Sequence, residues 1–203
     1  MNQKKTHKHI TEAIQILATL GMPRMQQNER SALCLLALLD LTPGKTWKQS
    51  KNPLMGITPI MDWAKRHYAK TYAPNTRETV RRQTMHQFVQ AGLALYNPDA
   101  PNRPVNSPKA VYQIEPNALQ LLRSFGSEGW HENVVSYLAN RQTLTARYAR
   151  ARKQNQVPVK IAPGKKIALS PGEHSELIRA IIEEFGPRFV PGGVLVYAGD
   201  TGD

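Results

Sequence analysis

Cysteine is rare in this chain, and this scarcity excludes disulfide bonds and cysteine-based metal sites. The 203 residues contain one cysteine, Cys34. Neither a disulfide framework nor a cysteine-based zinc module is therefore available. Cys34 lies inside the apolar run 32–39, which predicts a buried core thiol.

Long hydrophobic runs and nucleotide-binding motifs are absent as well. The run 32–39 is the longest apolar stretch, whereas a bilayer-spanning helix needs about 18–20 residues. The N-terminal residues 1–9 are polar and basic, and no signal-type apolar region follows them. We therefore expect a cytoplasmic protein with no membrane partner. No P-loop, dinucleotide fingerprint or HExxH motif occurs, so no nucleotide cofactor is expected.

Acidic residues are few, and the basic excess is concentrated in one part of the chain. Lys and Arg number 27 against 15 Asp and Glu, which gives a net charge of +12. Residues 1–156 carry +13 and residues 157–203 carry −1. The excess predicts a polyanionic partner, and the shift in charge predicts a domain border near residue 154.

The first part of the chain is predicted to be helical. The spacing of apolar residues predicts helices over residues 10–20 and 28–40, with Asn28 as the N-cap of the second. A proline at the first helical position predicts a third helix over 59–70. A tight turn then leads to a fourth helix over 76–91, and this order matches a helix-turn-helix.

The fourth helix has a polar side with side chains suited to DNA. Arginine pairs with guanine, glutamine pairs with adenine, and threonine suits phosphates. A solvated helix surface is the alternative interpretation of such a side. The candidate DNA-binding residues on this helix are Thr76, Arg77, Thr79, Arg81, Arg82, Gln83 and His86.

A β-hairpin and a long basic helix are predicted to follow. Short strands at 93–96 and 110–114 flank a loop that carries Arg103 and Lys109, which is the layout of a winged helix. A helix from about 128 to 153 then ends in a cationic stretch. Its Arg147 and Arg150 are candidate phosphate contacts, although the helix dipole alone also favours cations there.

The C-terminal part is predicted to be the start of an α/β domain. We expect a hairpin over 157–169, a helix over 170–185 and a buried strand over 193–198. On the helix, Leu177, Ile178, Ile181 and Ile182 are expected to face inward, with Glu184 beside this apolar stripe and Glu183 pointing away from it. These elements are too few to close a sheet core, so we expect the chain to be an N-terminal fragment.

The motifs of this part closely resemble the start of the catalytic region of the BsuBI/PstI type II restriction endonuclease family. The match is collinear over residues 157–203, and residues 1–154 are similar in layout to the helix-turn-helix domain of that family. The matching motifs are Val157-Pro-Val, Leu169-Ser-Pro-Gly-Glu-His174, Glu176-Leu177, Ile181-Ile-Glu-Glu-Phe185, Pro187-Arg-Phe189, Pro191-Gly192 and Tyr197-Ala-Gly-Asp-Thr201.

From the order of its elements we expect residues 1–154 to form a winged helix-turn-helix that is mainly α with a β-wing. The resemblance implies that the start of an α/β PD-(D/E)xK-like nuclease domain follows over 155–203. It also implies a homodimer that cleaves double-stranded DNA at a palindromic site with Mg²⁺. That chemistry needs paired carboxylates on neighbouring strands, and none of that pattern occurs in this sequence. The main catalytic acids are expected beyond residue 203, with Glu184 and Asp200 as supporting candidates here and the fragment itself inactive.

Two other functions remain open from the residues alone. A stand-alone winged-helix transcriptional regulator would use the same basic helix without catalysis. A general binder of nucleic acid, including double-stranded RNA, would need only the basic surface.

Overall fold

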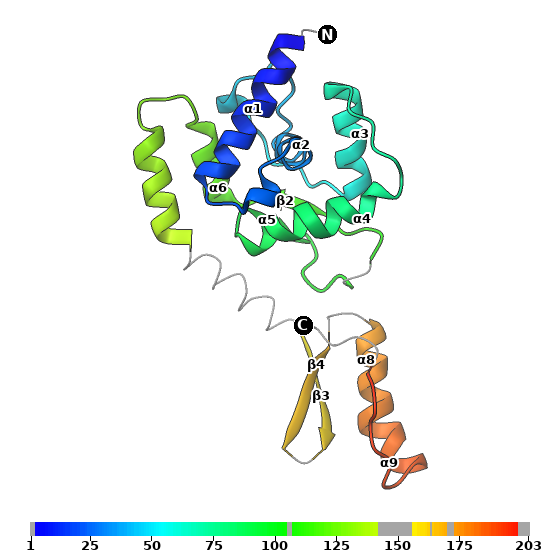
Figure 1. Cartoon of the computed structure of the whole chain (residues 1–203). Coiled ribbons are helices and arrows are strands. Elements are labelled where there is room, and N and C mark those ends of the chain that lie inside the picture. Colours follow the sequence, from blue (N-terminus) through cyan, green and yellow to red (C-terminus); the bar gives the residue numbers. More distant parts are fainter. Residues whose placement is uncertain (1–2, 105–106, 142–155, 163, 170–172, 199–203) are drawn as a thin grey trace. The chain divides into compact units, whose positions relative to one another are not determined.

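The computed structural model describes residues 3–104, 107–141, 156–162, 164–169 and 173–198 (Figure 1). The chain divides into two compact units. The first comprises Met1–Pro98 with Val111–Ala146, and the second comprises Asp99–Ala110 with Arg147–Asp203. Every helix within the described ranges is too short or too polar to span a bilayer.

The first unit is mainly helical, with one small sheet. In chain order its elements are α1 (Gln3–Thr19), η1 (Arg24–Gln26), α2 (Glu29–Leu38), η2 (Trp47–Gln49), α3 (Ile57–Tyr68), α4 (Thr76–Val80), η3 (Arg81–Met85), α5 (His86–Gln90), β1 (Ala94–Tyr96), β2 (Tyr112–Ile114), α6 (Pro116–Arg123) and a helix over 130–141. The predicted order of helices and strands is confirmed over the described residues, with boundaries shifted by up to seven residues. Residues 142–153 of the predicted basic helix lie outside the described residues.

Helix α2 lies at the centre of the first unit, and α1, α3 and the α4–η3–α5 helix pack around it (Figure 1). Residues 31–38 are all buried, because this segment is apolar on every side. Asn28 caps the helix as predicted, since its side-chain oxygen accepts from the Ser31 N–H at 3.0 Å. The Cys34 thiol is buried, and burial raises its pKa to about 12, as expected of a core thiol rather than a reactive one.

Polar side chains fix the C-terminal end of α2 against α1 and α3. The Tyr68 hydroxyl donates to the Leu41 carbonyl at 2.8 Å, and His9 Nδ1 lies 3.2 Å from the same hydroxyl. Asp40 accepts from Trp63 Nε1 at 3.2 Å and pairs with Lys45 at 2.7 Å. Each helix is thus held by specific bonds in addition to apolar contact.

The small sheet of the first unit is an antiparallel hairpin with one added bridge. Strands β1 and β2 pair Ala94 with Ile114 and Tyr96 with Tyr112. Met55, which precedes α3, also bridges to Tyr112 through two backbone bonds of 2.9 Å. The hairpin is therefore joined to the segment between α2 and α3.

The second unit contains a hairpin and a helix. Strand β3 (Val157–Ala162) pairs with β4 (Lys165–Leu169), as predicted. The helix runs through α8 (Glu173–Ala180), η4 (Ile181–Phe185) and α9 (Gly186–Phe189), beyond the predicted end at 185. Pro187 directly follows the π-helical turn η4, in which the Gly186 N–H donates to the Ile181 carbonyl, so the regular ladder of backbone bonds is already interrupted where the proline lies.

Two predictions about the second unit are wrong. Ile178 and Ile182 pack against the hairpin, but Leu177 and Ile181 are exposed, because a two-stranded hairpin covers only a narrow side of the helix. Residues 193–198 form no strand, and Val194, Val196 and Tyr197 are exposed, because no described strand pairs with this segment.

We expect Phe88→Ala to cost about 3–5 kcal/mol of unfolding free energy. Phe88 is fully buried on α5, and truncation leaves a cavity in the main core. Urea unfolding followed by circular dichroism measures the loss. Gln120→Ala, at an exposed position of α6, should change stability by less than about 0.5 kcal/mol. A loss below about 1 kcal/mol for Phe88→Ala would contradict the packing.

We expect the first unit to lose stability as the pH falls from about 7 to 5. Burial lowers the pKa of His9, while Glu12 raises it and Lys8 lowers it. The unfolded chain takes up a proton near pH 6.5 and the folded chain does so only at lower pH, so stability increases with pH in this window. His9→Gln should flatten the pH dependence measured by urea unfolding, whereas exposed His131→Gln should preserve it. An unchanged slope in His9→Gln would refute the assignment.

Candidate nucleic-acid interface

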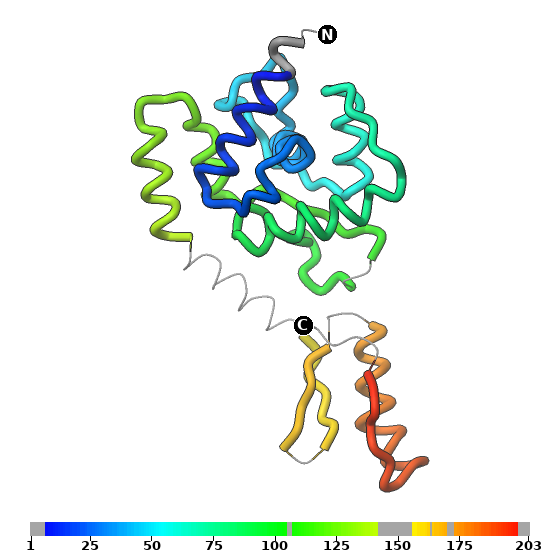
Figure 2. Tube along the Cα trace, in the orientation of Figure 1, coloured from blue at the N-terminus to red at the C-terminus, as the bar shows by residue number. Residues whose placement is uncertain are grey.

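The candidate recognition helix is one continuous helix over residues 76–90 with a π-helical turn in its middle (Figure 2). In this turn the His86 N–H donates to the Arg81 carbonyl, five residues back. Nearby, Gln26 Nε2 donates to the Gln83 carbonyl at 3.1 Å. A π-turn interrupts the regular ladder of backbone bonds, and the buried Gln26 side chain supports the helix at that point.

The inner side of this helix anchors it to the core. Val80, Met85 and Phe88 are buried in the main cluster, as the apolar spacing predicts. Thr84 is also buried, and its hydroxyl accepts from Arg30 Nε at 3.2 Å. Arg30 Nη2 lies 3.4 Å from Gln83 Oε1. Gln26 of η1 therefore holds the backbone of the candidate recognition helix, and Arg30 of α2 holds two of its side chains.

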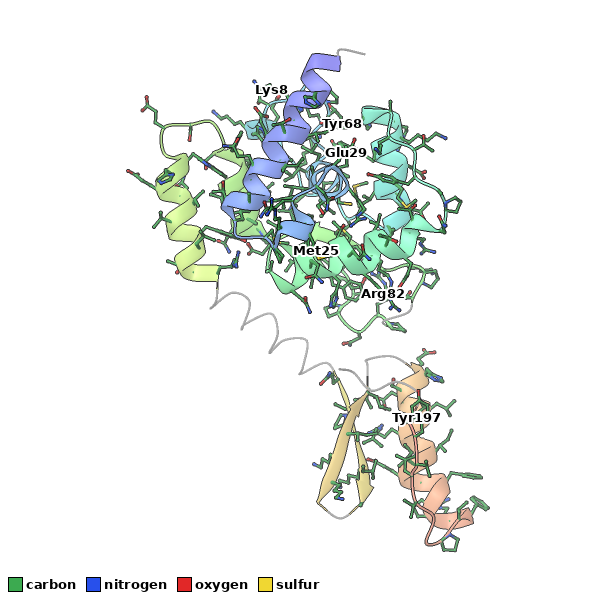
Figure 3. All side chains as sticks on the ribbon, viewed as in Figure 1. Lys8, Met25, Glu29, Tyr68, Arg82 and Tyr197 are labelled. Atoms are coloured by element: carbon green, nitrogen blue, oxygen red, sulfur yellow. The ribbon has the colours of Figure 1, made fainter. Side chains whose placement is uncertain are left out.

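The outer side presents most of the predicted DNA-binding residues to solvent. Arg77, Arg82, Gln83 and His86 are exposed, whereas Thr76, Thr79 and Arg81 are half-buried. In Figure 3, Arg82 lies along the lower edge of the first unit in this view. All seven residues belong to one helix, so the structure brings them together on a single element.

An acidic residue, Glu78, lies among these cations. Arg81 donates to both carboxylate oxygens of Glu78, at 2.9 and 2.7 Å, and Arg82 Nε donates to Glu78 Oε1. The hydrogen bonds from Arg81 and Arg82 lower the pKa of Glu78 to about 2, so this carboxylate is ionised at neutral pH.

The two arginines differ in their surroundings. The Arg82 side chain is 74% exposed, but that of Arg81 is 37% exposed. The bonds to Glu78, together with the nearby Tyr112 and Tyr96 of the hairpin, raise the pKa of Arg81. Arg81 is thus the inner member of the trio, and Arg82 is the member available to an incoming ligand.

Sequence reasoning missed three residues of this region. Glu78 escaped notice because a negative charge is not expected on a surface that binds DNA. Gln26 and Arg30 are more than 50 residues away in sequence, and their bonds to Gln83 and Thr84 follow from tertiary packing alone. Only Glu78 offered a sequence signal, through its spacing of three and four residues from two arginines.

The other predicted contacts lie outside this helix. Arg103 forms a two-bond pair with Asp99 at 3.0 and 2.7 Å, and Lys109 is exposed. Arg147 and Arg150 lie outside the described residues.

The predicted catalytic acids are not brought together. Glu184 is exposed on the C-terminal helix, and Asp200 lies outside the described residues. Glu183, expected to point away, instead accepts from the Lys160 N–H at 2.7 Å, so the expected orientation of the two glutamates is reversed. Among the residues that the structure describes, no group of three or more His, Cys, Asp or Glu side chains could hold a metal ion.

Comparison with known proteins places both units in one family. Residues 7–146 match the model of the BsuBI/PstI restriction endonuclease HTH domain. Residues 157–203 match the model of the BsuBI/PstI restriction endonuclease domain.

Individual relatives agree with this assignment. The chain is 62% identical to the type II restriction enzyme BsuBI of Bacillus subtilis over 97% of its length, and 37% identical to AplI of Arthrospira platensis over 86%. The structure of the SdaI restriction endonuclease covers 95% of the chain with a TM-score of 0.63 and 36% identity. The chain spans 62%, 53% and 60% of these three proteins, respectively.

The two family matches cover the helix-turn-helix unit and the segment after it, in the same order as the strongly basic and the slightly acidic parts of the sequence. The chain therefore belongs to the BsuBI/PstI restriction endonuclease family.

Proposed function

We propose that this chain is the DNA-recognition part, with the beginning of the nuclease part, of a type II restriction endonuclease. The observation that carries the proposal is the exposed arginine-bearing side of helix 76–90 within the unit matched to the family's HTH domain. In a helix-turn-helix, the second helix enters the major groove and reads base edges. Here α3 supplies the first helix, and α4–η3–α5 supplies the second.

The hairpin β1–β2 acts as the wing of this module. It follows the recognition helix directly, and the Met55 bridge joins it to the segment between the earlier helices. The loop of the wing carries Arg103 and Lys109, which suit contacts to the backbone or the minor groove. In chain order, α2, the Met55 bridge, α3, the α4–η3–α5 helix and the β1–β2 hairpin follow one another, and this order supports a winged helix-turn-helix.

The predicted residues divide into two roles on this proposal. Arg82 and Gln83, exposed in the middle of the helix, read bases, because their side chains pair with guanine and adenine. Phosphate and sugar contacts set the register on the duplex. The residues proposed for these contacts are Thr76, Arg77, Thr79, Arg81, His86, Arg103, Lys109, Arg147 and Arg150.

We place the functional border near residue 154, with recognition by 1–154 and the start of the nuclease domain at 155–203. The two family matches end and begin on either side of this point. The whole protein would act as a homodimer on a palindromic site, because two-fold protein symmetry matches a two-fold DNA sequence.

Cleavage would depend on a divalent cation, for which family resemblance favours Mg²⁺. Bound at paired carboxylates, such an ion activates water and neutralises the scissile phosphate. The residues described here do not fit that ion, since Glu183 bonds to the hairpin backbone and Glu184 is exposed. Glu184 and Asp200 are proposed only as supporting acids that do not themselves hold the ion.

A stand-alone transcriptional regulator is the less favoured alternative. The second unit matches a nuclease domain, and the relatives found are restriction enzymes. A regulator would require a different role for residues 157–203.

We expect the chain to bind duplex DNA with a steep salt dependence and not to cleave it in Mg²⁺. With about six phosphate contacts, affinity should fall about a thousandfold between about 50 and 200 mM salt, because counterions are released on binding. Fluorescence anisotropy with a labelled duplex measures the affinity, and gel electrophoresis of a plasmid measures cleavage. Salt-insensitive binding would contradict the phosphate contacts, and double-strand cleavage would contradict the lack of a catalytic set in this chain.

We expect Arg82→Ala to reduce sequence discrimination by about 1–3 kcal/mol, the usual value of an arginine that reads guanine. Competition binding would compare a duplex selected from a random library with its single-base variants. Arg147→Ala is the comparison, and it should weaken all duplexes alike because it contacts phosphate. An equal loss for selected and unselected duplexes in Arg82→Ala would refute the reading role.

A further inference from the structure

The Glu78–Arg82 pair has hydrogen-bonding capacity left over after the two side chains have bonded to each other. An ionised carboxylate offers about four acceptor positions. Arg81 uses one on each oxygen of Glu78, and Arg82 uses a second on Oε1. One acceptor position on Oε2 remains. Arg82 uses its Nε–H, so both of its terminal nitrogens are available as donors.

The position of the carboxylate is fixed from the inner side. Arg81 donates two hydrogen bonds to Glu78. Its side chain is only 37% exposed and lies near Tyr96 and Tyr112 of the hairpin. Glu78 is 53% exposed and Arg82 is 74% exposed. Arg81 therefore anchors the pair, and the remaining donors and acceptor belong to the two more exposed members.

This combination is complementary to one base pair. In the major groove a G·C pair presents the O6 and N7 acceptors of guanine next to the N4 amine donor of cytosine. A guanidinium donates to the guanine acceptors, and a carboxylate accepts from the cytosine amine. An A·T pair instead places the thymine O4 acceptor and methyl group where the cytosine amine would be, and these offer nothing to a carboxylate.

We propose that Glu78 is a specificity-determining residue that reads the cytosine of a G·C pair whose guanine is read by Arg82. The inference rests on the proposed function of helix 76–90. Glu78 has a second effect, because its negative charge lies at the surface that meets the phosphates. It weakens binding to duplexes that offer no cytosine amine at this position, so it lowers non-specific affinity while the G·C site retains its contacts.

A structural role predicts a different result. Glu78 lies in the first helical turn, and its ion pairs with Arg81 and Arg82 add a small stabilisation to an exposed helix. If that were its entire role, removing its charge would alter the melting temperature slightly and affect all duplexes equally. Sequence preference is the readout that separates the two roles.

The test uses Glu78→Gln, which keeps the shape of the side chain but removes its charge and adds an amide donor. The probes are a duplex selected from a random library, its single-base variants and a duplex of alternating A·T pairs. At one G·C position of the selected site, discrimination should fall about tenfold. Affinity for the A·T duplex should rise, and the slope of log affinity against log salt should steepen by about one. Circular dichroism verifies that the variant is folded.

Glu29→Gln is the matched control. Glu29 is also in the first turn of a helix, is 47% exposed and pairs with Lys70 at 2.8 Å. Glu29→Gln removes one negative charge, as Glu78→Gln does. The affinities for all duplexes should therefore change by one common factor. If Glu78→Gln behaves in the same way while Arg82→Ala loses discrimination, the inference is overturned and the proposed function stands. If neither Arg82→Ala nor Glu78→Gln changes sequence preference, the proposed reading function of the helix itself fails.

Discussion

A helix with no solvent-facing side is stable only if other elements cover it all round, and α2 imposes this requirement on the first unit. Its residues 31–38 are buried without exception. Exposing any side of it would cost about 25 cal/mol for each Å² of apolar surface. Helices α1, α3 and α4–η3–α5 therefore have fixed places around it. The position of the recognition helix is in this sense a consequence of the apolar run that contains Cys34.

Apolar packing alone leaves a helix free to slide or rotate, and hydrogen bonds from η1 and from the first turn of α2 restrict that freedom. Gln26 bonds to the Gln83 carbonyl, and Arg30 bonds to Thr84 and Gln83. These partners lie at the π-helical turn, where the backbone departs from the α-helical pattern. A base-reading side chain must be held in a defined geometry to discriminate, and a rigid scaffold supplies it. The core and the proposed reading surface are thus connected through a few bonds at one turn of helix.

Features that depend on local sequence could be predicted, and those that depend on distant partners could not. The Asn28 cap and the buried Cys34 follow from spacing within a few residues, and both hairpins join strands that are neighbours along the chain. The contacts of Gln26 and Arg30 with helix 76–90 join residues more than 50 positions apart, and no local pattern encodes them. The reversed orientation of Glu183 and Glu184 has a local cause. The π-turn Ile181–Phe185 inserts an extra residue into the helix and shifts the residues around it from the positions that a regular helical spacing assigns.

A high positive charge increases the affinity for every duplex, whereas sequence specificity requires that the affinity differ between duplexes. The +13 of residues 1–156 favours every DNA sequence equally, because phosphates are the same throughout a duplex. A protein that relied on this term alone would remain on the large excess of non-specific sites. A carboxylate among the arginines reduces the common term and restores affinity only where a base supplies the missing donor. The single bond that Arg82 makes to Glu78 is exposed and weak. Arg82, as the more exposed partner, can therefore turn its terminal nitrogens toward a base at little energetic cost, which is what a reading residue needs on a strongly basic protein.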